Sequence, residues 1–287
     1  MLNEKTSSDE TIITATRDNY DQLANFINQP NRIHRHLDWF GPLDWLGNQP
    51  FLIELQDQKI QAALCATPEN QAAAWIRTFA IKKHLPLQPA WHRLLSRAIQ
   101  KLRDQGIDRL AALALHGWFE TLLIDSGFSN LQNIVVLEWQ GNLPKEQSFH
   151  PGIVIRPMQL SDLPEVEIID QLAFPPLWQN SLAGLTKALN QPGISTVALK
   201  GQRIIGYQIS TSMTIYGHLA RLAVHPDFQR QGIAFSLVYD LLEEFKRRGF
   251  WRITVNTQSN NTPSLKLYKK FGFKRTPEEI PVFEINL

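Results

Sequence analysis

The stretch LAVHPDFQRQGIAFSLVYDLL, residues 222–242, decides the fold of this 287-residue chain. An apolar strand ending at Val224 leads through a glycine-containing turn, residues 229–234, into a helix whose apolar residues recur at helical spacing. The glycine in such a turn lets the backbone approach a ligand closely, and the start of a helix offers unpaired N–H groups. The pattern therefore predicts a phosphate-binding turn between a strand and a helix.

Further elements surround this unit on both sides. Downstream we expect a strand at residues 251–256, a helix that Thr262 caps and Gly272 closes, and a last strand at 282–285. Upstream we expect a helix that Ser161 caps, and strands at 153–156, 196–199, 204–211 and 218–224. The order of elements predicts a mixed α/β (α+β) domain.

The same order of elements can be read twice along the chain. At an offset of 143, Phe79-Ala80-Ile81 falls on Leu222-Ala223-Val224, and Gly106 falls on Gly249. A further shift of two residues places Gly127-Phe128 on Gly272-Phe273. Such self-similarity predicts two copies of one fold. We expect a first domain at residues 1–140, a polar linker at 141–152 and a second domain at 153–287.

The differences between the copies indicate which of them carries chemistry. Under this alignment Gly232 falls on Pro89 and Ala234 on Trp91, so the first copy lacks small residues at the turn. Two polar residues of the second copy, Asn261 and Tyr268, fall on His116 and Leu123. The first copy is therefore expected to be degenerate, without a cofactor turn, and the chemistry is expected in the C-terminal half.

Composition limits the partners of the chain. The formal net charge is +2, divided as −1 up to Lys145 and +3 beyond it, which does not favour nucleic-acid binding by either half. Cys65 is the only cysteine, which excludes an intramolecular disulfide and suits a reducing compartment. No apolar run is long enough to cross a membrane. We expect a soluble cytoplasmic protein with no membrane or nucleic-acid partner.

The second half, with its strand, turn and N-T-P-S-L-K-L-Y-K-K-F-G-F segment, resembles the GCN5-related N-acetyltransferase (GNAT) superfamily, and the first half resembles it more weakly. The resemblance implies two tandem domains, each with a mixed, mostly antiparallel twisted sheet flanked by helices. It implies acetyl-CoA as the acyl donor, with its pyrophosphate at the turn and its pantetheine arm along the preceding strand. The cofactor-binding residues so implied are Leu222, Ala223, Val224, Gln229, Arg230, Gln231, Gly232, Ile233, Ala234, Asn261 and Tyr268.

The resemblance also implies direct attack of an amine on the thioester within a ternary complex. Tyr268 is then the candidate acid that protonates the departing thiolate. Relatives that acetylate protein N-termini often carry a glutamate where this chain has Asn256, so the general base needs another residue. His218 is our candidate because it titrates near neutrality, with Tyr216 and Glu167 as weaker candidates. No metal site is expected, and His34 and His36 are expected on the surface.

Three functions remain open at this point. The first is acetyl transfer from acetyl-CoA to a primary amine of a small molecule. The second is acetylation of protein or peptide N-termini, which Asn256 disfavours. The third is a non-enzymatic acyl-CoA sensor or interaction module that keeps the cofactor site. The aromatic segments at residues 174–178 (FPPLW) and 37–46 (LDWFGPLDWL) are expected to pack a core or domain interface or to line the acceptor cleft, and the sequence does not specify the oligomeric state.

Overall fold

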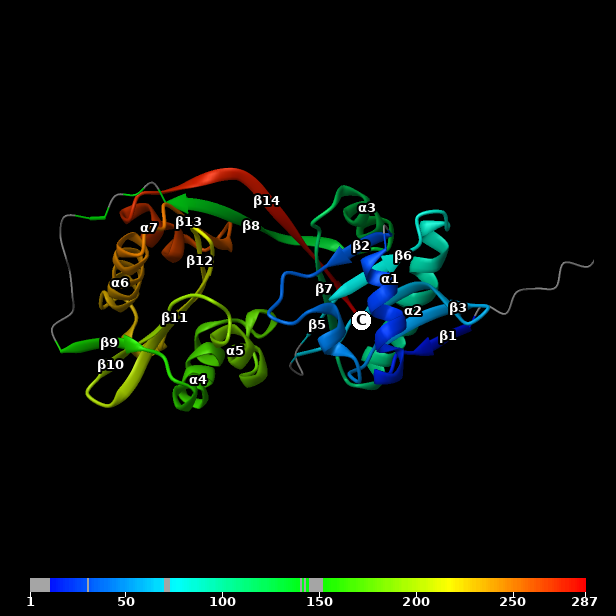
Figure 1. Cartoon of the computed structure of the whole chain (residues 1–287), viewed down its shortest axis with the longest axis horizontal. Helices are drawn as coiled ribbons and strands as arrows, with labels where there is room; N and C mark the ends of the chain where they lie inside the picture. The colour runs from blue at the N-terminus through cyan, green and yellow to red at the C-terminus, as the bar shows by residue number, and fades with distance from the viewer. Residues whose placement is uncertain (1–10, 30, 70–72, 140, 142, 145–151) are drawn as a thin grey trace, which may run out of the picture. The chain divides into compact units, whose positions relative to one another are not determined.

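The computed structural model (Figure 1) describes residues 11–287 except 30, 70–72, 140, 142 and 145–151. The contacts divide the chain into two compact units. The first unit extends to Leu131 and also contains Pro281–Leu287, whereas the second consists of Gln132–Ile280. The expected linker at 141–152 lies largely outside the described residues, and the domain boundaries at 140 and 153 stay predictions. No helix in the described part of the chain is both long and apolar enough to cross a membrane.

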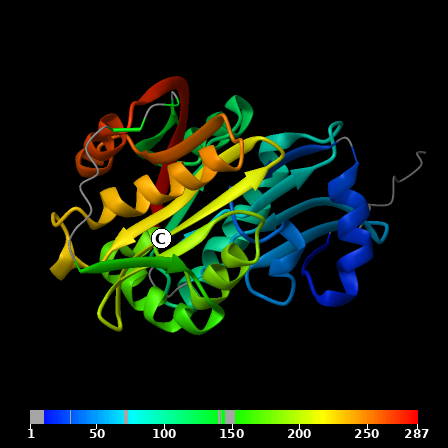
Figure 2. The ribbon, with the colours of Figure 1, turned by 60° about the vertical axis from the view of Figure 1, so that its left-hand side comes forward.

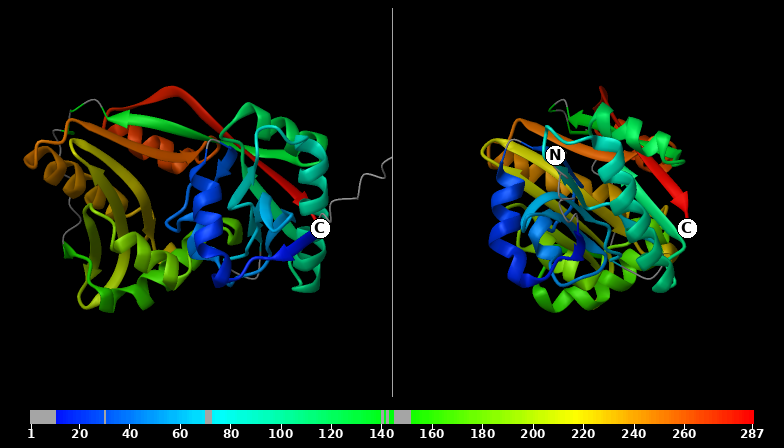
Figure 3. Two further views of the ribbon diagram at one scale, coloured as in Figure 1. Left: turned by 45° about the vertical axis from the view of Figure 1, so that its right-hand side comes forward. Right: turned by 90° about the vertical axis from the view of Figure 1, so that its right-hand side faces the viewer.

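The first unit is built around a five-stranded antiparallel sheet with a helix on each face. In sheet order its strands are β1 (Thr11–Thr14), β3 (Phe51–Gln56), β4 (Lys59–Cys65), β6 (Thr78–Ile81) and β2 (Arg32–Arg35). Alternating residues of β4 face opposite ways: Ala62 and Leu64 pack with α2 (Leu87–Asp104), whereas Ala63 and Cys65 pack with α1 (Tyr20–Asn28). Figure 3 shows α1 and α2 on either side of these strands.

Shorter elements complete the first unit. They are η1 (Arg17–Asn19), η2 (Pro42–Trp45), β5 (Ala74–Trp75), β7 (Arg109–Leu113) and α3 (Gly117–Asp125). β5 pairs in parallel with β7, and the end of β14 (Phe273–Asn286) pairs with β7 in antiparallel fashion. The strand expected at 282–285 in the second copy is therefore the end of a longer strand, and it pairs within the first unit.

The second unit contains most of a nine-stranded sheet. Its first six strands in sheet order are β9 (Ile153–Pro157), β10 (Ser195–Lys200), β11 (Arg203–Met213), β12 (Tyr216–Val224), β13 (Arg252–Gln258) and β8 (Ser129–Trp139), and β14 follows β8. The β12–β13 pair is parallel, and the other pairs among these six strands are antiparallel. The helices are η3 (Leu160–Asp162), α4 (Leu163–Ala173), η4 (Pro176–Trp178), α5 (Leu182–Leu189), η5 (Pro226–Phe228), α6 (Ile233–Arg247) and α7 (Thr262–Lys270). Figure 2 shows α6 on one face and α4 with α5 on the other.

Two helix starts differ from their expected positions by one residue. The turn η3 includes Ser161, so the N-cap residue of α4 is Asp162. The N-cap residue of α7 is Asn261, whose Oδ1 accepts a hydrogen bond from the Ser264 N–H at 3.3 Å, and Thr262 is already helical. In both places two residues suited to capping are adjacent, and the local turn decides between them.

The strand register supports the tandem repeat. Trp75 pairs with Ala111 in β5–β7, and His218 pairs with Thr254 in β12–β13, which is the same pair displaced by 143. A backbone hydrogen bond recurs with a shift of one residue in the acceptor strand: the Lys82 N–H donates to the Gln61 carbonyl, and the His225 N–H, at the offset of 143, donates to the Ile205 carbonyl. The chain therefore consists of two mixed α/β units with one topology of strands around the central parallel pair.

Candidate functional site

The centre of the candidate site is an edge of β12 without a strand partner. β12 pairs with β11 as far as Val224, but its parallel pairing with β13 ends at Leu219. A register shift in the β11–β12 pair leaves Ala220 opposite no residue, which is a β-bulge that redirects the strand. Residues 220–224, which we call the open edge, are thus paired on one side only within the described part of the chain.

Strand alternation decides which peptide groups face this open edge. The His225 N–H donates to the Ile205 carbonyl of β11, so the neighbouring residue Val224 directs its groups to the opposite side. The Gln229 side chain confirms this direction, because its Nε2 donates to the Val224 carbonyl at 3.1 Å. By the same alternation the N–H and carbonyl of Leu222 also face the open edge. An extended ligand can pair there as an added strand.

The turn after β12 has the conformation that the sequence predicts. Gly232 is in the left-handed region with φ +85° and forms the N-cap of α6, while Arg230 has φ +62°. The first N–H groups of α6, beginning with Ile233, have no acceptor within the helix and lie at the positive end of its dipole. Successive N–H groups in such a turn form a concave anion site.

A close approach between strands and helix places this turn beside the open edge. A Cβ atom built on Gly206 of β11 would lie 3.0 Å from the Ala223 carbonyl oxygen and 3.3 Å from a methyl carbon of Ile233. The start of α6 therefore packs against the end of β12 only because Gly206 has no side chain. These contacts bring the predicted residues of the strand and the turn together at one place.

Asn261 caps the start of α7 and Tyr268 lies on that helix, but only Tyr268 leaves its polar atom without a hydrogen bond among the described residues. The Asn261 side chain caps its own helix and donates from Nδ2 to Thr257 Oγ1 at 3.1 Å. Tyr268 is 4% exposed, packs with Leu219 and Phe273, and makes no hydrogen bond within the described residues. Burial raises the pKa of the Tyr268 phenol above its usual value, so the hydroxyl keeps its proton at neutral pH.

His218 lies on the other face of β12. Its neighbours Gly217 and Leu219 face α6, because a Cβ on Gly217 would meet the Phe245 ring and Leu219 packs in the same cluster as Phe245. Burial lowers the pKa of His218, which keeps the imidazole neutral. Its Nδ1 lies 2.9 Å from Thr254 Oγ1; in the tautomer that donates there, Nε2 carries the free lone pair.

The weaker base candidates have other roles or surroundings. Glu167 accepts a hydrogen bond from the Leu182 N–H at 2.7 Å, at the start of α5. Tyr216 is 40% exposed and lies beside Trp251, with a ring separation of 5.9 Å. Neither has the combination of burial and a free acceptor that His218 offers.

A buried ion pair next to the open edge was not singled out by the sequence. Arg221 donates from Nε and Nη2 to the two carboxylate oxygens of Asp170 at 2.7 and 2.8 Å. Asp170 is fully buried and also accepts from the Tyr207 hydroxyl and the Asn180 N–H. Asp170 is one of three acidic residues in its helix, so the available signal was only the single arginine in the mostly apolar strand β12.

Arg221 also holds the aromatic segment at residues 174–178. Its Nη2 donates to the Trp178 carbonyl at 2.6 Å, and its guanidinium lies 3.5 Å from the centroid of the Phe174 ring. This segment forms the end of α4 and η4, on the same face of the sheet as His218. A side chain of the open edge thus fixes the loop on that face.

The first unit lacks the corresponding phosphate turn. Pro89 and Trp91 lie within the first turns of α2, and Trp91 is fully buried in the core. Cys65 is buried with its Sγ 2.9 Å from Thr67 Oγ1, and burial raises the pKa of the thiol to about 11, which disfavours the nucleophilic thiolate. Trp45 packs in the core with Phe51 rather than on the surface.

The surface placement expected for His34 is wrong. Its side chain is fully buried because it faces inward from β2, the last strand of the sheet, and stacks on Phe119 with ring centroids 3.9 Å apart. His36 lies two residues further along the chain, and the centroid of its ring is 4.7 Å from that of the Trp75 ring. No group of three or more His, Cys, Asp or Glu side chains suited to a metal ion occurs among the described residues.

Known proteins resemble this chain both in sequence and in fold. Residues 163–273 match the model of the "Acetyltransferase (GNAT) family". The chain is 33% identical over 89 residues to "N-alpha-acetyltransferase 30" of Schizosaccharomyces pombe, a match that covers 29% of this chain and spans only 59% of the relative. It is 26% identical over 121 residues to "[Ribosomal protein bS18]-alanine N-acetyltransferase" of Escherichia coli, covering 42% of this chain and 79% of the relative.

A solved structure shares the fold along the entire length. It is a "Tandem GNAT protein from the clavulanic acid biosynthesis pathway", with a TM-score of 0.64, 12% sequence identity and coverage of 98% of both chains. At 12% sequence identity, the likeness between the two proteins concerns the fold alone. The duplicated architecture inferred from the repeat therefore has a counterpart of known structure.

Proposed function

From the premise that this chain is a member of the GNAT family through residues 163–273, we propose that its second unit transfers an acetyl group from acetyl-CoA to a primary amine. The observation that carries the proposal is that the open edge of β12 lies directly before the turn at Gly232. The open edge suits an extended amide-containing arm, and the N–H groups of the turn suit a pyrophosphate. Acetyl-CoA combines both features and supplies an acyl group as a thioester.

The two candidate catalytic side chains have complementary states on opposite faces of β12. In the tautomer whose Nδ1–H donates to Thr254, His218 Nε2 is a neutral acceptor on the face of α4, where an approaching amine can transfer its proton. The Tyr268 hydroxyl is a protonated donor on the face of α7, suited to the departing sulfur. Arg221 fixes the loop that contains Phe174, which we assign to the acceptor side.

Calorimetric titration of acetyl-CoA into the wild-type chain and into Gly232→Pro tests the site. Proline cannot adopt φ +85°, so the variant should lose binding while its thermal unfolding stays cooperative. CoA release is then followed with a panel of small amines and of peptides with free N-termini. Binding with release identifies an enzyme, whereas binding with no release from any amine favours a sensor. Absence of binding to the wild-type chain rejects both.

Peptide N-termini are the second acceptor class that we include. The observation in their favour is that two similar proteins are named for such acceptors, an N-alpha-acetyltransferase and a ribosomal-protein alanine acetyltransferase. Asn256, on β13, lacks the carboxylate that the resemblance associates with this activity. A peptide acceptor would therefore depend on His218 as the base, and His218→Gln should abolish its acetylation.

A further inference from the structure

The first unit contains a strand at the position that corresponds to the open edge of the second. β6 pairs with β4 on one side, as β12 pairs with β11. On its other side β6 pairs with β2, from Arg32 opposite Ile81 to Arg35 opposite Thr78 (Figure 1). At the offset of 143, Thr78–Ile81 falls on residues 221–224, so β2 lies along the first unit's copy of the open edge.

The peptide groups involved are the equivalent ones. The Lys82 N–H donates to β4, so alternation directs the groups of Ile81 and Phe79 away from β4 and toward β2. Phe79 corresponds to Leu222, whose groups face the open edge of the second unit. The pairing that an extended ligand would make at Leu222 is therefore made at Phe79 by His34 of the same chain.

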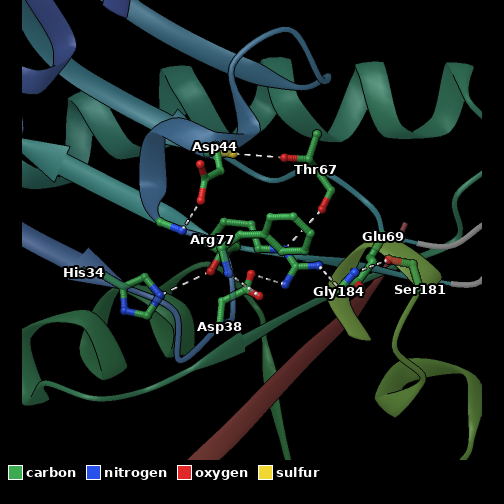
Figure 4. Close-up of polar contacts among 12 residues, drawn as sticks. His34, Asp38, Asp44, Thr67, Glu69, Arg77, Ser181 and Gly184 are labelled. Atoms are coloured by element: carbon green, nitrogen blue, oxygen red, sulfur yellow. Dashed lines mark hydrogen bonds and ion pairs between the residues drawn. The ribbon is translucent and has the colours of Figure 1, made fainter. Parts of the chain in front are cut away.

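Side chains hold β2 in this place. Just beyond β2, the carboxylate of Asp38 lies 2.7 Å from Nη1 of Arg77, and Glu69 lies 3.3 Å from Nη2 of the same arginine (Figure 4). Arg77 is buried, stacks over the Trp45 ring, and corresponds to Ala220 of the second unit, which cannot form such an ion pair. The feature that fixes the strand is thus specific to the first unit.

The side chain of His34 fills the inner end of the same space. Its Nε2 lies 3.3 Å from the carbonyl oxygen of Ile76, where the chain passes from β5 to β6. Ile76 corresponds to Leu219, at which the β12–β13 pairing ends and the open edge begins. The imidazole therefore lies where the innermost part of a ligand would reach in the second unit.

The helix that follows the strand also starts differently in the two units, and this difference removes the turn from the first unit. α6 begins at Ile233, which corresponds to Ala90, but α2 already begins at Leu87. The residues that form the phosphate turn in the second unit are therefore helical in the first, with Pro89 among them. Both halves of the cofactor site, the edge and the turn, are occupied by the chain itself.

We infer that β2 is a permanent internal substitute for the pantetheine arm, so that the chain binds a single acyl-CoA and the first unit is a ligand-independent scaffold. This inference depends on the proposed function, because the second unit's site defines the comparison. Loss of the phosphate turn alone would not have this consequence, because a first unit with a free strand edge could still bind the pantetheine arm of an acyl-CoA.

Hydrogen exchange with mass spectrometry, read on the intact chain with and without saturating acetyl-CoA, tests the inference. The amides of β6, and those of Arg32 and His34 in β2, should exchange slowly in both states, because alternation directs them into the paired sheet. Peptides covering residues 220–235 should exchange faster in the free chain and gain protection with acetyl-CoA. Calorimetry should give one site per chain, and Gly232→Pro should reduce it to none.

Different results reject different statements. Protection of 220–235 together with new protection or new exposure at β2 and β6 would show that acetyl-CoA enters the first unit, and would overturn the inference. Two sites per chain, or one remaining in Gly232→Pro, would overturn it as well. If acetyl-CoA changes no peptide at all, the proposed function fails. In that case slow exchange of β2 would still support its structural role, whereas fast exchange would reject it.

Discussion

Replacing Tyr268 with phenylalanine separates catalysis from stability. The hydroxyl makes no hydrogen bond within the described residues, and the residue is 4% exposed. Because the hydroxyl has no hydrogen bond to lose, its removal should leave the free energy of unfolding nearly unchanged. Loss of a general acid should lower turnover by about 10²–10⁴-fold. A side chain with only a packing role would show neither the fall in turnover nor its restriction to kcat.

The assay follows CoA release with the acceptor found in the amine panel, together with urea unfolding of the same samples. The matched control is Tyr207→Phe, because that hydroxyl donates to buried Asp170, and its loss should cost about 1–3 kcal/mol of unfolding free energy. For Tyr268→Phe, kcat should fall while the dissociation constant of acetyl-CoA changes little. Turnover within about threefold of wild type would refute the assignment of Tyr268 as the acid.

Three further predictions concern packing, pH and the buried ion pair. Gly206→Ala should cost about 1–3 kcal/mol in urea unfolding and weaken acetyl-CoA binding in calorimetry, while Gly117→Ala, where a Cβ meets nothing, should cost little. Burial lowers the pKa of His34 from 6.5 to about 4, so the unfolded chain binds a proton first on acidification. Stability measured by urea unfolding should therefore fall by about 3 kcal/mol from pH 6.5 to 4, and His34→Gln should flatten that slope. Asp170→Asn should lower the unfolding free energy by about 3–5 kcal/mol, because it leaves Arg221 buried without its full partner; an unchanged thermal midpoint would contradict this.

Local patterns in the sequence were sufficient for most of the fold. The strand before Val224, the glycine turn and the periodic helix carry their own signals, and the repeat at an offset of 143 indicated two copies of one fold, although it did not identify the parallel strand pairs. The helix caps at Ser161 and Thr262 were misplaced, because neighbouring residues have similar capping propensity and only the three-dimensional turn distinguishes them.

The parts of the site that could not be predicted depend on distant contacts. Arg221 and Asp170 are 51 residues apart, and no periodicity links them. His34 appears in the polar sequence Arg-Ile-His-Arg, which is typical of an exposed strand, and among these four residues only His34 is fully buried. Its imidazole is covered by Phe119, 85 residues later in the sequence, and a single sequence does not identify so distant a contact.

The two units meet one structural requirement in different ways. A strand that diverges from its parallel neighbour leaves peptide groups on one edge, and such groups need a partner when they are shielded from water. In the first unit His34 and the rest of β2 supply that partner permanently, with Arg77 fixing the strand. In the second unit the groups at Leu222 remain available, and Ala220 leaves no ion pair to hold a substitute strand. The same divergence of strands thus gives a closed core in one copy and an edge paired on one side only in the other, which supports the proposal that the chemistry belongs to the copy with Gly232 and Tyr268.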